Sequence, residues 1–344
     1  MGICKNIQVL KAYTPGEQPK DPDIIKLNTN ENPYPPSPSV AAALKAFDVL
    51  KLRLYPDPVY SALRQRLAAI HGCSEQQVFV GNGSDEILAL CTRAFVENDG
   101  CIGYFEPSYS LYAVLAAIRG VEQRPVALAN DFTWRMPAGY EASLFLITNP
   151  NAPTSMVYNK AVVADFCKGF KGVVVIDEAY GDFADTNCME FALSSCNTNT
   201  LVMRTLSKAF SLAGLRFGYV IGSDALIKAL YKIKDSYNMD MLAQVVGLAA
   251  LNDLPHMREN VRKIQVTRKR LTTELSRRGW SVCDSQTNFL FARPPNGDAK
   301  NVFDALKANK IYVRYFPGPA TGAYLRITVG TDSQADALLA ALAL

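Results

Sequence analysis

The chain has 344 residues, of which 49% are hydrophobic and 20% charged, and its formal net charge is +4. This length suits a large domain joined to a smaller one, and the composition is ordinary for a globular protein. The sequence contains no block of like charges and no apolar run of about 18 residues, so we expect neither a nucleic-acid partner nor a membrane span.

The first 40 residues are rich in proline, asparagine and serine, which disfavours helix interiors. We expect them to form an extended N-terminal arm. Helical patterns follow at residues 39–50 and 59–71.

From Gln77 onward, short apolar runs alternate with longer helical patterns. One of these helical patterns ends near Phe95, and another spans residues 108–119. Most of the runs are continuous, as expected for strands covered on both faces. The expected strands are VFV (78–80), CIGYF (101–105), LFLIT (144–148), VVVID (173–177), TLVMRT (200–205) and FGYVIG (217–222). This alternation predicts an α/β domain with a mainly parallel sheet.

The last third of the chain has an α+β pattern, which predicts a separate, smaller domain. A helical region at 223–250 precedes a long amphipathic helix at 256–278. Strands are expected near 280–283, 288–292, 311–315 and 324–329, and helices at 298–308 and 332–342. We therefore divide the chain into residues 1–50 (N-terminal arm and part of the small domain), 51–245 (large domain) and 246–344 (small domain).

Cysteine and histidine usage limits the possible chemistry. None of the eight cysteines forms a Cys-x-x-Cys pair, and the N-terminus has no signal-peptide pattern, so we expect reduced thiols in a cytoplasmic protein. The two histidines, His71 and His256, lie in no partner motif, which argues against a histidine-based triad and against a metal site.

The segment TLSKAFSLAGLR (205–216) carries a lysine in an unusual context. A lysine at a strand end is ordinarily a solvated surface residue, but Lys208 lies among apolar residues and hydroxyls. Desolvation and a nearby cation favour the neutral, nucleophilic form of such an amine. Thr205, Ser207 and Arg216 could then hold a phosphate dianion.

Asp177 ends the apolar run VVVID, at the strand edge where ligands bind in open α/β sheets. A buried carboxylate needs a cationic partner, and a protonated pyridine nitrogen would supply one. Tyr180, three residues further on, could reach the phenolic oxygen of the same ring. Taken alone, DEAY fits a strand end followed by a helix N-cap equally well.

Three weaker signals point the same way. VGNGSDE (80–86) places a glycine turn at a helix start, which suits one phosphate but lacks the ending of a nucleotide P-loop. Tyr109 lies at a strand-to-helix junction, where its ring could stack on a planar cofactor or simply pack in the core. Arg326 lies inside an apolar strand, where a substrate carboxylate would be a suitable partner.

In this order and spacing, the segments resemble the fold-type I pyridoxal-5′-phosphate (PLP) aminotransferases, and among these the histidinol-phosphate aminotransferases. The resemblance covers the chain from Tyr13 to the C-terminal helix. Its motifs are LNTNENP (27–33), YPD (55–57), GNGSDE (81–86), DEAY (177–180), TLSKAF (205–210), GLR (214–216) and LRITVG (325–330).

The resemblance implies a role for each matching residue. Lys208 would carry the cofactor as a Schiff base and, once released, transfer the catalytic proton. Asp177 would pair with the ring nitrogen, Tyr180 would bond the ring oxygen, and Tyr109 would stack on the ring. The cofactor phosphate would be surrounded by Ser84, Asp85, Thr205, Ser207 and Arg216.

The same resemblance implies a homodimer with shared active sites, because Tyr55 would reach the cofactor phosphate of the neighbouring subunit. Arg326 would bind the substrate α-carboxylate. Tyr13, Arg314 and Asn30 match positions on the substrate side, and the first two are expected to meet the distal phosphate of the amino substrate.

One loop departs from the family pattern PNNPTG and reads Pro150-Asn151-Ala152-Pro153-Thr154-Ser155. Ala152 stands where the family has the asparagine that bonds the ring oxygen. Either Asn151, which we include among the cofactor-binding residues, or Asn149 is expected to take over that contact.

The implied reaction is transamination between L-histidinol phosphate and 2-oxoglutarate in histidine biosynthesis. An aromatic amino acid aminotransferase and a threonine-phosphate decarboxylase are the neighbouring alternatives. A non-catalytic PLP-binding regulatory domain is a third, but the proline-rich arm has no room for the helix-turn-helix that accompanies such domains. A P-loop kinase and a nicotinamide enzyme are disfavoured because their glycine fingerprints are missing.

Overall fold

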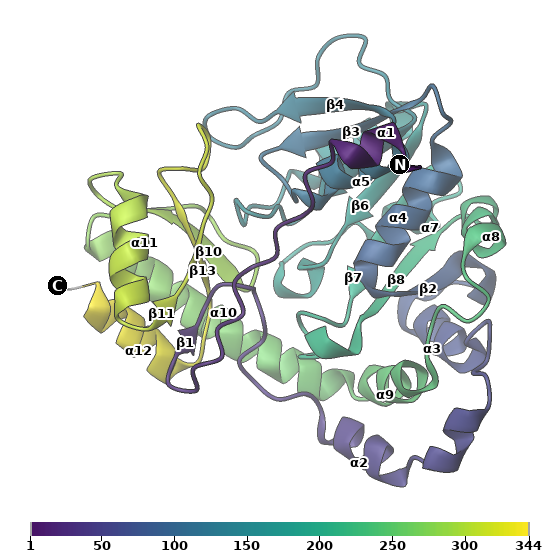
Figure 1. The fold of residues 1–344 in the computed structure, drawn as a ribbon, viewed down its shortest axis with the longest axis horizontal. Coiled ribbons are helices and arrows are strands. Elements are labelled where there is room, and N and C mark those ends of the chain that lie inside the picture. Colours follow the sequence, from purple (N-terminus) through teal and green to yellow (C-terminus); the bar gives the residue numbers. More distant parts are fainter. Residues whose placement is uncertain (1, 343–344) are drawn as a thin grey trace.

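The structure is a computed structural model and describes residues 2–342. A seven-stranded sheet with the order β2-β8-β7-β6-β5-β3-β4 forms the centre of the large domain (Figure 1). Its strands are β2 (Val78–Asn82), β3 (Cys101–Glu106), β4 (Glu122–Ala127), β5 (Leu144–Thr148), β6 (Val173–Asp177), β7 (Thr200–Thr205) and β8 (Phe217–Gly222). Only β8 runs antiparallel to its neighbours, so the prediction of a mainly parallel α/β sheet is confirmed.

Both faces of this sheet are buried. In β6, Val174 and Ile176 belong to one hydrophobic cluster and Val175 to the other, because successive side chains of a strand point to opposite faces. One face is covered by α4 (Gly83–Phe95), α5 (Leu111–Arg119) and α8 (Asp224–Ile233). The other face packs against α3 (Ser61–His71), α6 (Lys160–Gly169), α7 (Met189–Leu193) and α9 (Met241–Leu251).

The small domain is built on an antiparallel sheet with the order β12-β13-β10-β9. Its elements are α10 (Leu254–Arg277), β9 (Ser281–Val282), β10 (Phe289–Arg293), α11 (Ala299–Ala308), β11 (Ile311–Tyr312), β12 (Arg314–Tyr315), β13 (Leu325–Thr328) and α12 (Asp332–Ala341). The long helix α10 runs from the large domain into the small one (Figure 1). The strand expected at 311–315 is divided, because β11 pairs with β1 and β12 pairs with β13.

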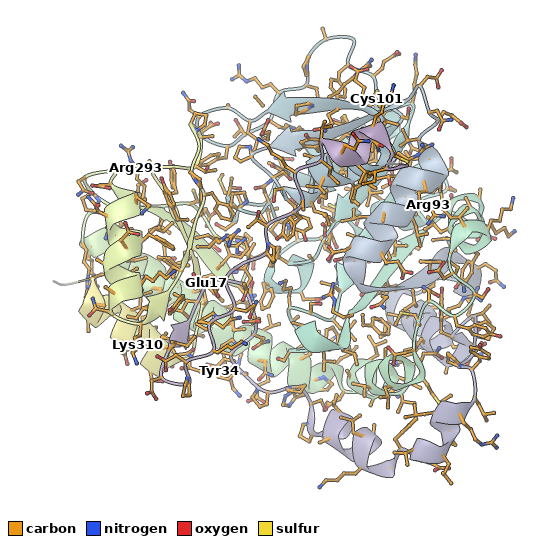
Figure 2. The ribbon with its side chains drawn as sticks, in the orientation of Figure 1. Glu17, Tyr34, Arg93, Cys101, Arg293 and Lys310 are labelled. Carbon is orange, nitrogen blue, oxygen red and sulfur yellow. The ribbon has the colours of Figure 1, made fainter. Side chains whose placement is uncertain are left out.

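The N-terminal arm is mostly extended but contains two short elements, α1 (Lys5–Gln8) and β1 (Ile25–Lys26). The Asn6 side chain donates to the Ala117 and Ile118 carbonyls at the end of α5, which fixes the start of the arm on the large domain. Further along, Glu17 pairs with Lys307 and Asp21 pairs with Lys310 of the small domain. Glu17 and Lys310 are labelled in Figure 2. The arm therefore crosses from one domain to the other.

After the arm come α2 (Pro38–Ala46) and a 3₁₀ turn at Val49–Arg53. Three further 3₁₀ turns lie at Glu75–Gln77, Gly181–Phe183 and Ala213–Leu215. Among the helices of residues 2–342, none has both the length and the apolar character needed to cross a bilayer.

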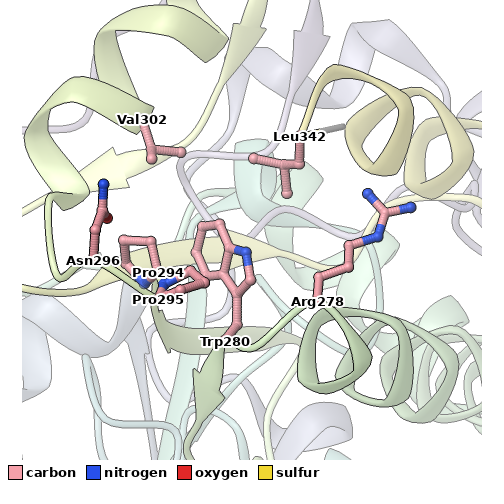
Figure 3. A pocket seen from close by; sticks show the side chains of 7 residues that line it. All are labelled: Arg278, Trp280, Pro294, Pro295, Asn296, Val302 and Leu342. Atoms are coloured by element: carbon pink, nitrogen blue, oxygen red, sulfur yellow. The ribbon is translucent and has the colours of Figure 1, made fainter. Parts of the chain in front are cut away.

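A pocket of about 600 Å³ opens in the small domain beside Trp280, Pro294 and Leu342 (Figure 3). None of the predicted site residues lines it.

Candidate active site

The carboxyl ends of β5, β6 and β7 lie side by side and carry the polar residues of the site. Thr148 is the register partner of Asp177, and Asp177 is the partner of Met203, two residues before Thr205. This is the edge where ligands bind in open α/β sheets. Lys208 follows β7 directly and reaches the same edge.

The Lys208 side chain is half-buried and points toward the arm and Tyr180. Its Nζ donates to the Thr29 carbonyl at 3.4 Å and lies 5.8 Å from the centre of the Tyr180 ring. The Asn32 side chain donates to the Lys208 and Ala209 carbonyls at 3.3 and 3.1 Å and so holds the loop that bears the lysine. Sequence reasoning assigned no role to Thr29 or Asn32, although both lie in the LNTNENP motif.

Asp177 is a buried carboxylate, with 4% of its surface exposed. Oδ2 accepts the Tyr112 hydroxyl at 2.9 Å and Oδ1 accepts the Ala179 backbone N–H at 3.0 Å. Within residues 2–342, no cationic side chain forms an ion pair with it. Burial raises the pKa of Asp177 to about 6, and the nearby charges of Asp85 and Glu178 act in the same direction. The site therefore lacks the cation that a charged carboxylate needs here.

This burial predicts a pH effect on the cofactor-free protein. The folded chain keeps the Asp177 proton up to about pH 6, whereas the unfolded chain loses it near 3.8. The folded state thus binds more protons between these values, and its stability falls as the pH rises through them, by about 3 kcal/mol. We expect the unfolding free energy of the wild type, relative to Asp177→Asn, to fall by about 2–3 kcal/mol from pH 4 to pH 7.

Urea unfolding of the cofactor-free wild type and of cofactor-free Asp177→Asn at several pH values measures this difference. Subtracting the unfolding free energy of the variant from that of the wild type removes the contribution of all other titrating groups. A difference that stays constant with pH would show that Asp177 is already ionised at pH 4.

Tyr180 is oriented by Asn30. The Asn30 side-chain amide donates to the Tyr180 hydroxyl at 2.9 Å, and its oxygen accepts the Thr328 hydroxyl at 3.1 Å. Because the Tyr180 oxygen is accepting, its own proton is available for another acceptor, such as a cofactor ring oxygen. Asn30, which is expected on the substrate side, contacts Tyr180 in this structure, and its contact with a substrate stays a prediction.

The two candidate asparagines of the departing loop are both engaged within the protein. Asn151 accepts the Thr154 backbone N–H and hydroxyl, and its amide donates to the Pro107 carbonyl at 3.4 Å. The Asn149 oxygen accepts the Tyr158 N–H, and its amide lies 3.4 Å from the Cys188 sulfur. A contact of Asn151 with the ring oxygen stays a prediction, and Tyr180 is the donor that the structure leaves available.

The predicted phosphate residues gather at the start of α4. Arg216 lies over Gly83, where an added Cβ would stand 2.6 Å from Nη2, and it donates to Asp85 at 3.2 Å. Asp85 also accepts the Tyr109 hydroxyl at 3.2 Å. A helix start with free N–H groups beside a guanidinium is a suitable phosphate site. This cradle is open to solvent in the single chain, since the side chains of Arg216 and Asp85 are 46% and 44% exposed.

Two buried hydroxyls lie together at the end of β7, where Thr205 is the last residue of the strand and Ser207 lies two residues further on. The Thr205 and Ser207 hydroxyls are 2.9 Å apart, and the Ser207 backbone N–H donates to Thr205 at 3.1 Å. Ser84 follows Gly83 in the first turn of α4, beside Arg216. All five predicted phosphate residues therefore belong to the ends of β7, β8 and α4.

Arg326 on β13 faces the site with an unused donor. Its Nη2 donates to the Asn28 carbonyl at 2.8 Å, whereas its buried Nε has no partner among the described residues. The guanidinium lies 5.5 Å from the Phe289 ring and 5.2 Å from the Phe316 ring. Burial lowers the pKa of Arg326, but a guanidinium keeps its charge in proteins. An anionic ligand with two oxygens would complete this site.

The arm passes over the site beside Arg326. The Tyr13 and Tyr109 rings meet edge to face with their centres 5.8 Å apart. Arg314 donates to the Thr14 and Pro15 carbonyls at 3.2 and 3.4 Å, so its guanidinium holds the arm. Tyr13 therefore lies beside Tyr109 and Arg314 contacts the arm, and the contact of both residues with the substrate stays a prediction.

Tyr55 is the predicted site residue that this chain does not bring to the others. Its ring stacks on Tyr237 with a centre distance of 4.4 Å, and 78% of its surface is exposed.

This chain is similar to known proteins in both sequence and fold. The profile of the family "Aminotransferase class I and II" matches residues 22–342. A histidinol-phosphate aminotransferase from Synechocystis sp. is 43% identical over 100% of this chain and 98% of its own. One from Geobacter sulfurreducens is 42% identical over 98% of this chain and 97% of its own.

Among solved structures, histidinol-phosphate aminotransferase from Sinorhizobium meliloti in complex with pyridoxal-5′-phosphate superposes with a TM-score of 0.89. It is 26% identical and covers 99% of this chain and 96% of its own. L-Threonine-O-3-phosphate decarboxylase from Porphyromonas gingivalis, at 21% identity and a TM-score of 0.80 over 93% of this chain and 98% of its own, shares the fold. The chain therefore belongs to the class I and II aminotransferases, and among them to the histidinol-phosphate aminotransferase family.

Proposed function

We propose that the chain transfers the amino group of L-histidinol phosphate to 2-oxoglutarate as a step of histidine biosynthesis. Curated relatives that carry this enzyme name are 40–43% identical over nearly the whole chain, which supports the substrate pair. The observation that carries the proposal is the grouping of Lys208, Asn30 and Arg326 around Tyr180.

As a member of this family the chain is a PLP-dependent aminotransferase, and its residues fit the cofactor. The buried Asp177 carboxylate lacks a cation, which the protonated ring nitrogen would supply. Arg216 and the start of α4 would hold the phosphate, and Tyr109 would face the ring. When bound, the cofactor supplies an electron sink and carries the amino group between the two half-reactions.

The protein residues then have separate tasks. Lys208 would attach the cofactor through Nζ and, once displaced by the substrate amine, remove the proton from the substrate Cα. Asp177 would keep the ring nitrogen protonated, and Tyr180 would donate to the ring oxygen. Arg326 would bind the α-carboxylate of 2-oxoglutarate through two charge-assisted hydrogen bonds. In histidinol phosphate a phosphate ester replaces that carboxylate, so Arg326 and Arg314 would face an anion in both half-reactions.

An amino-donor screen with 2-oxoglutarate tests this function. Glutamate formation is measured with histidinol phosphate, phenylalanine, tyrosine and phosphothreonine, and unphosphorylated histidinol serves as the matched control. We expect the highest kcat/KM with histidinol phosphate and a large loss with histidinol, because the arginine contacts then lack their anion. A higher kcat/KM with phenylalanine or tyrosine would support an aromatic aminotransferase instead, and carbon dioxide release from phosphothreonine would support the decarboxylase.

We further propose a homodimer with shared active sites. An apolar surface is exposed on α2 and on residues 49–55 after it, where the most exposed side chains are Val49 at 70%, Leu50 at 72% and Tyr55 at 78%. A surface of this kind on one protruding segment is typical of an interface. A second copy that covers it would bring its Tyr55 to the open phosphate cradle. A monomeric mass of the holoenzyme in solution would contradict this proposal.

We also propose a cytoplasmic location, which the eight free cysteines favour.

A further inference from the structure

A chain of hydroxyl groups leads from the surface of the site to the back of Asp177. The Ser108 and Thr148 hydroxyls are 3.1 Å apart, and those of Thr148 and Tyr112 are 2.6 Å apart. The Tyr112 hydroxyl ends the chain with its 2.9 Å bond to Asp177 Oδ2. These contacts join the loop after β3, the end of β5, the first turn of α5 and the end of β6.

The direction of every proton in this chain is set by its last member. An ionised carboxylate only accepts hydrogen bonds, so the single proton of Tyr112 must point at Asp177. The oxygen of Tyr112 then accepts the Thr148 hydroxyl, and Thr148 in turn accepts the Ser108 hydroxyl. Burial and the facing carboxylate raise the pKa of Tyr112, so the phenol keeps the proton that it donates.

Tyr112 is held rigidly enough to orient its partner. Its side chain is fully buried, and its ring packs against Tyr109 and Tyr104 with centre distances of 5.7 and 6.2 Å. The second oxygen of Asp177 is fixed by the Ala179 N–H. Both oxygens therefore have one fixed donor each, which leaves the carboxylate a single orientation.

We propose that Tyr112 is a positioning residue for catalysis: its phenol, oriented by Thr148 and Ser108, fixes the Asp177 carboxylate so that one oxygen meets the cofactor ring nitrogen. The inference rests on the proposed function, because it requires the bound cofactor. Without the phenol, Asp177 loses a donor and becomes more basic, and the shared proton moves from the ring nitrogen toward the carboxylate.

Tyr112→Phe tests this inference, with Tyr104→Phe as the matched control. Tyr104 is a neighbouring buried tyrosine whose hydroxyl bonds Gln123 at 2.9 Å, away from Asp177. The holoenzymes are prepared with ¹⁵N-labelled PLP, and the ring-nitrogen chemical shift is recorded together with kcat and KM. In Tyr112→Phe we expect the ¹⁵N resonance to move toward that of a neutral pyridine and kcat to fall about tenfold, with KM within about twofold. Tyr104→Phe should match the wild type.

Two further variants keep the test informative if Tyr112→Phe folds poorly. Thr148→Val removes the donor to Tyr112 and should shift the ¹⁵N resonance in the same direction by less, whereas Thr148→Ser keeps the hydroxyl and should restore it. A wild-type ¹⁵N shift in a folded Tyr112→Phe or Thr148→Val holoenzyme would overturn the inference. A wild-type chain that takes up no PLP would instead overturn the proposed function.

Discussion

Replacing Lys208 with alanine is expected to remove both the yellow colour of the covalently bound cofactor and the transamination activity. No side chain can replace both the attachment point and the proton-transferring amine, so we expect kcat/KM to fall by roughly 10³-fold or more. Within residues 2–342 the Lys208 amine contacts the Thr29 carbonyl and the face of Tyr180 and forms no ion pair, so the fold should survive the change. Absorbance of the dialysed protein and glutamate formation measure the two losses.

Two control variants test whether the effect comes from the amine of Lys208 itself. The first keeps the positive charge at this position, and the second removes another lysine. Lys208→Arg keeps a cation at the position but no amine that can be attached, and it should be as inactive as the alanine variant. Lys26→Ala removes a lysine of the N-terminal arm that pairs with Glu31, and this variant should stay yellow and active. A Lys208→Ala protein that remains coloured and active would exclude Lys208 from the site.

Replacing Arg326 with alanine is expected to lower kcat/KM for 2-oxoglutarate by about 10²–10³-fold, since two charge-assisted hydrogen bonds to the substrate are lost. The effect should lie mainly in KM. The guanidinium contacts the Asn28 carbonyl and the rings of Phe289 and Phe316 rather than Asp177 or Lys208, so the absorbance spectrum of the bound cofactor should remain unchanged. Steady-state kinetics and the spectrum are measured on the same preparation.

Arg326→Lys is the matched control, because it keeps the charge and loses the planar pair of donors. We expect its kcat/KM to lie between those of the wild type and the alanine variant. If Arg326→Ala has an ordinary KM for 2-oxoglutarate, another residue binds the carboxylate.

The central strands could be predicted because they are buried on both faces and read as continuous apolar runs. β4 could not, because it is an edge strand in which Val126 is the one buried residue and the other five are exposed. β1 was also missed, since its two residues become a strand only by pairing with Ile311 and Tyr312 at the other end of the chain.

Some residues of the site could likewise be predicted from the sequence, and others could not. Lys208, Asp177 and Arg326 stand out in the sequence because each is a charged residue in an apolar context. Tyr112 gives no such signal, since its contact with Asp177 depends on how α5 is rotated against the sheet. The one signal of Tyr112 in the sequence is that it is a tyrosine in the first turn of the helix that follows a buried strand. The loop at Ala152 needed the structure, which shows both neighbouring asparagines bonded within the protein.

The N-terminal arm is attached at both ends, to α5 through Asn6 and to β11 through β1. Residues 9–24 therefore connect the two domains by a stretch with a fixed number of residues. Within this stretch Tyr13 packs against Tyr109, and the Pro15 carbonyl accepts a hydrogen bond from Arg314. Because an extended chain spans at most about 3.5 Å per residue, the number of residues in this stretch sets an upper limit on how far α5 and β11 can separate.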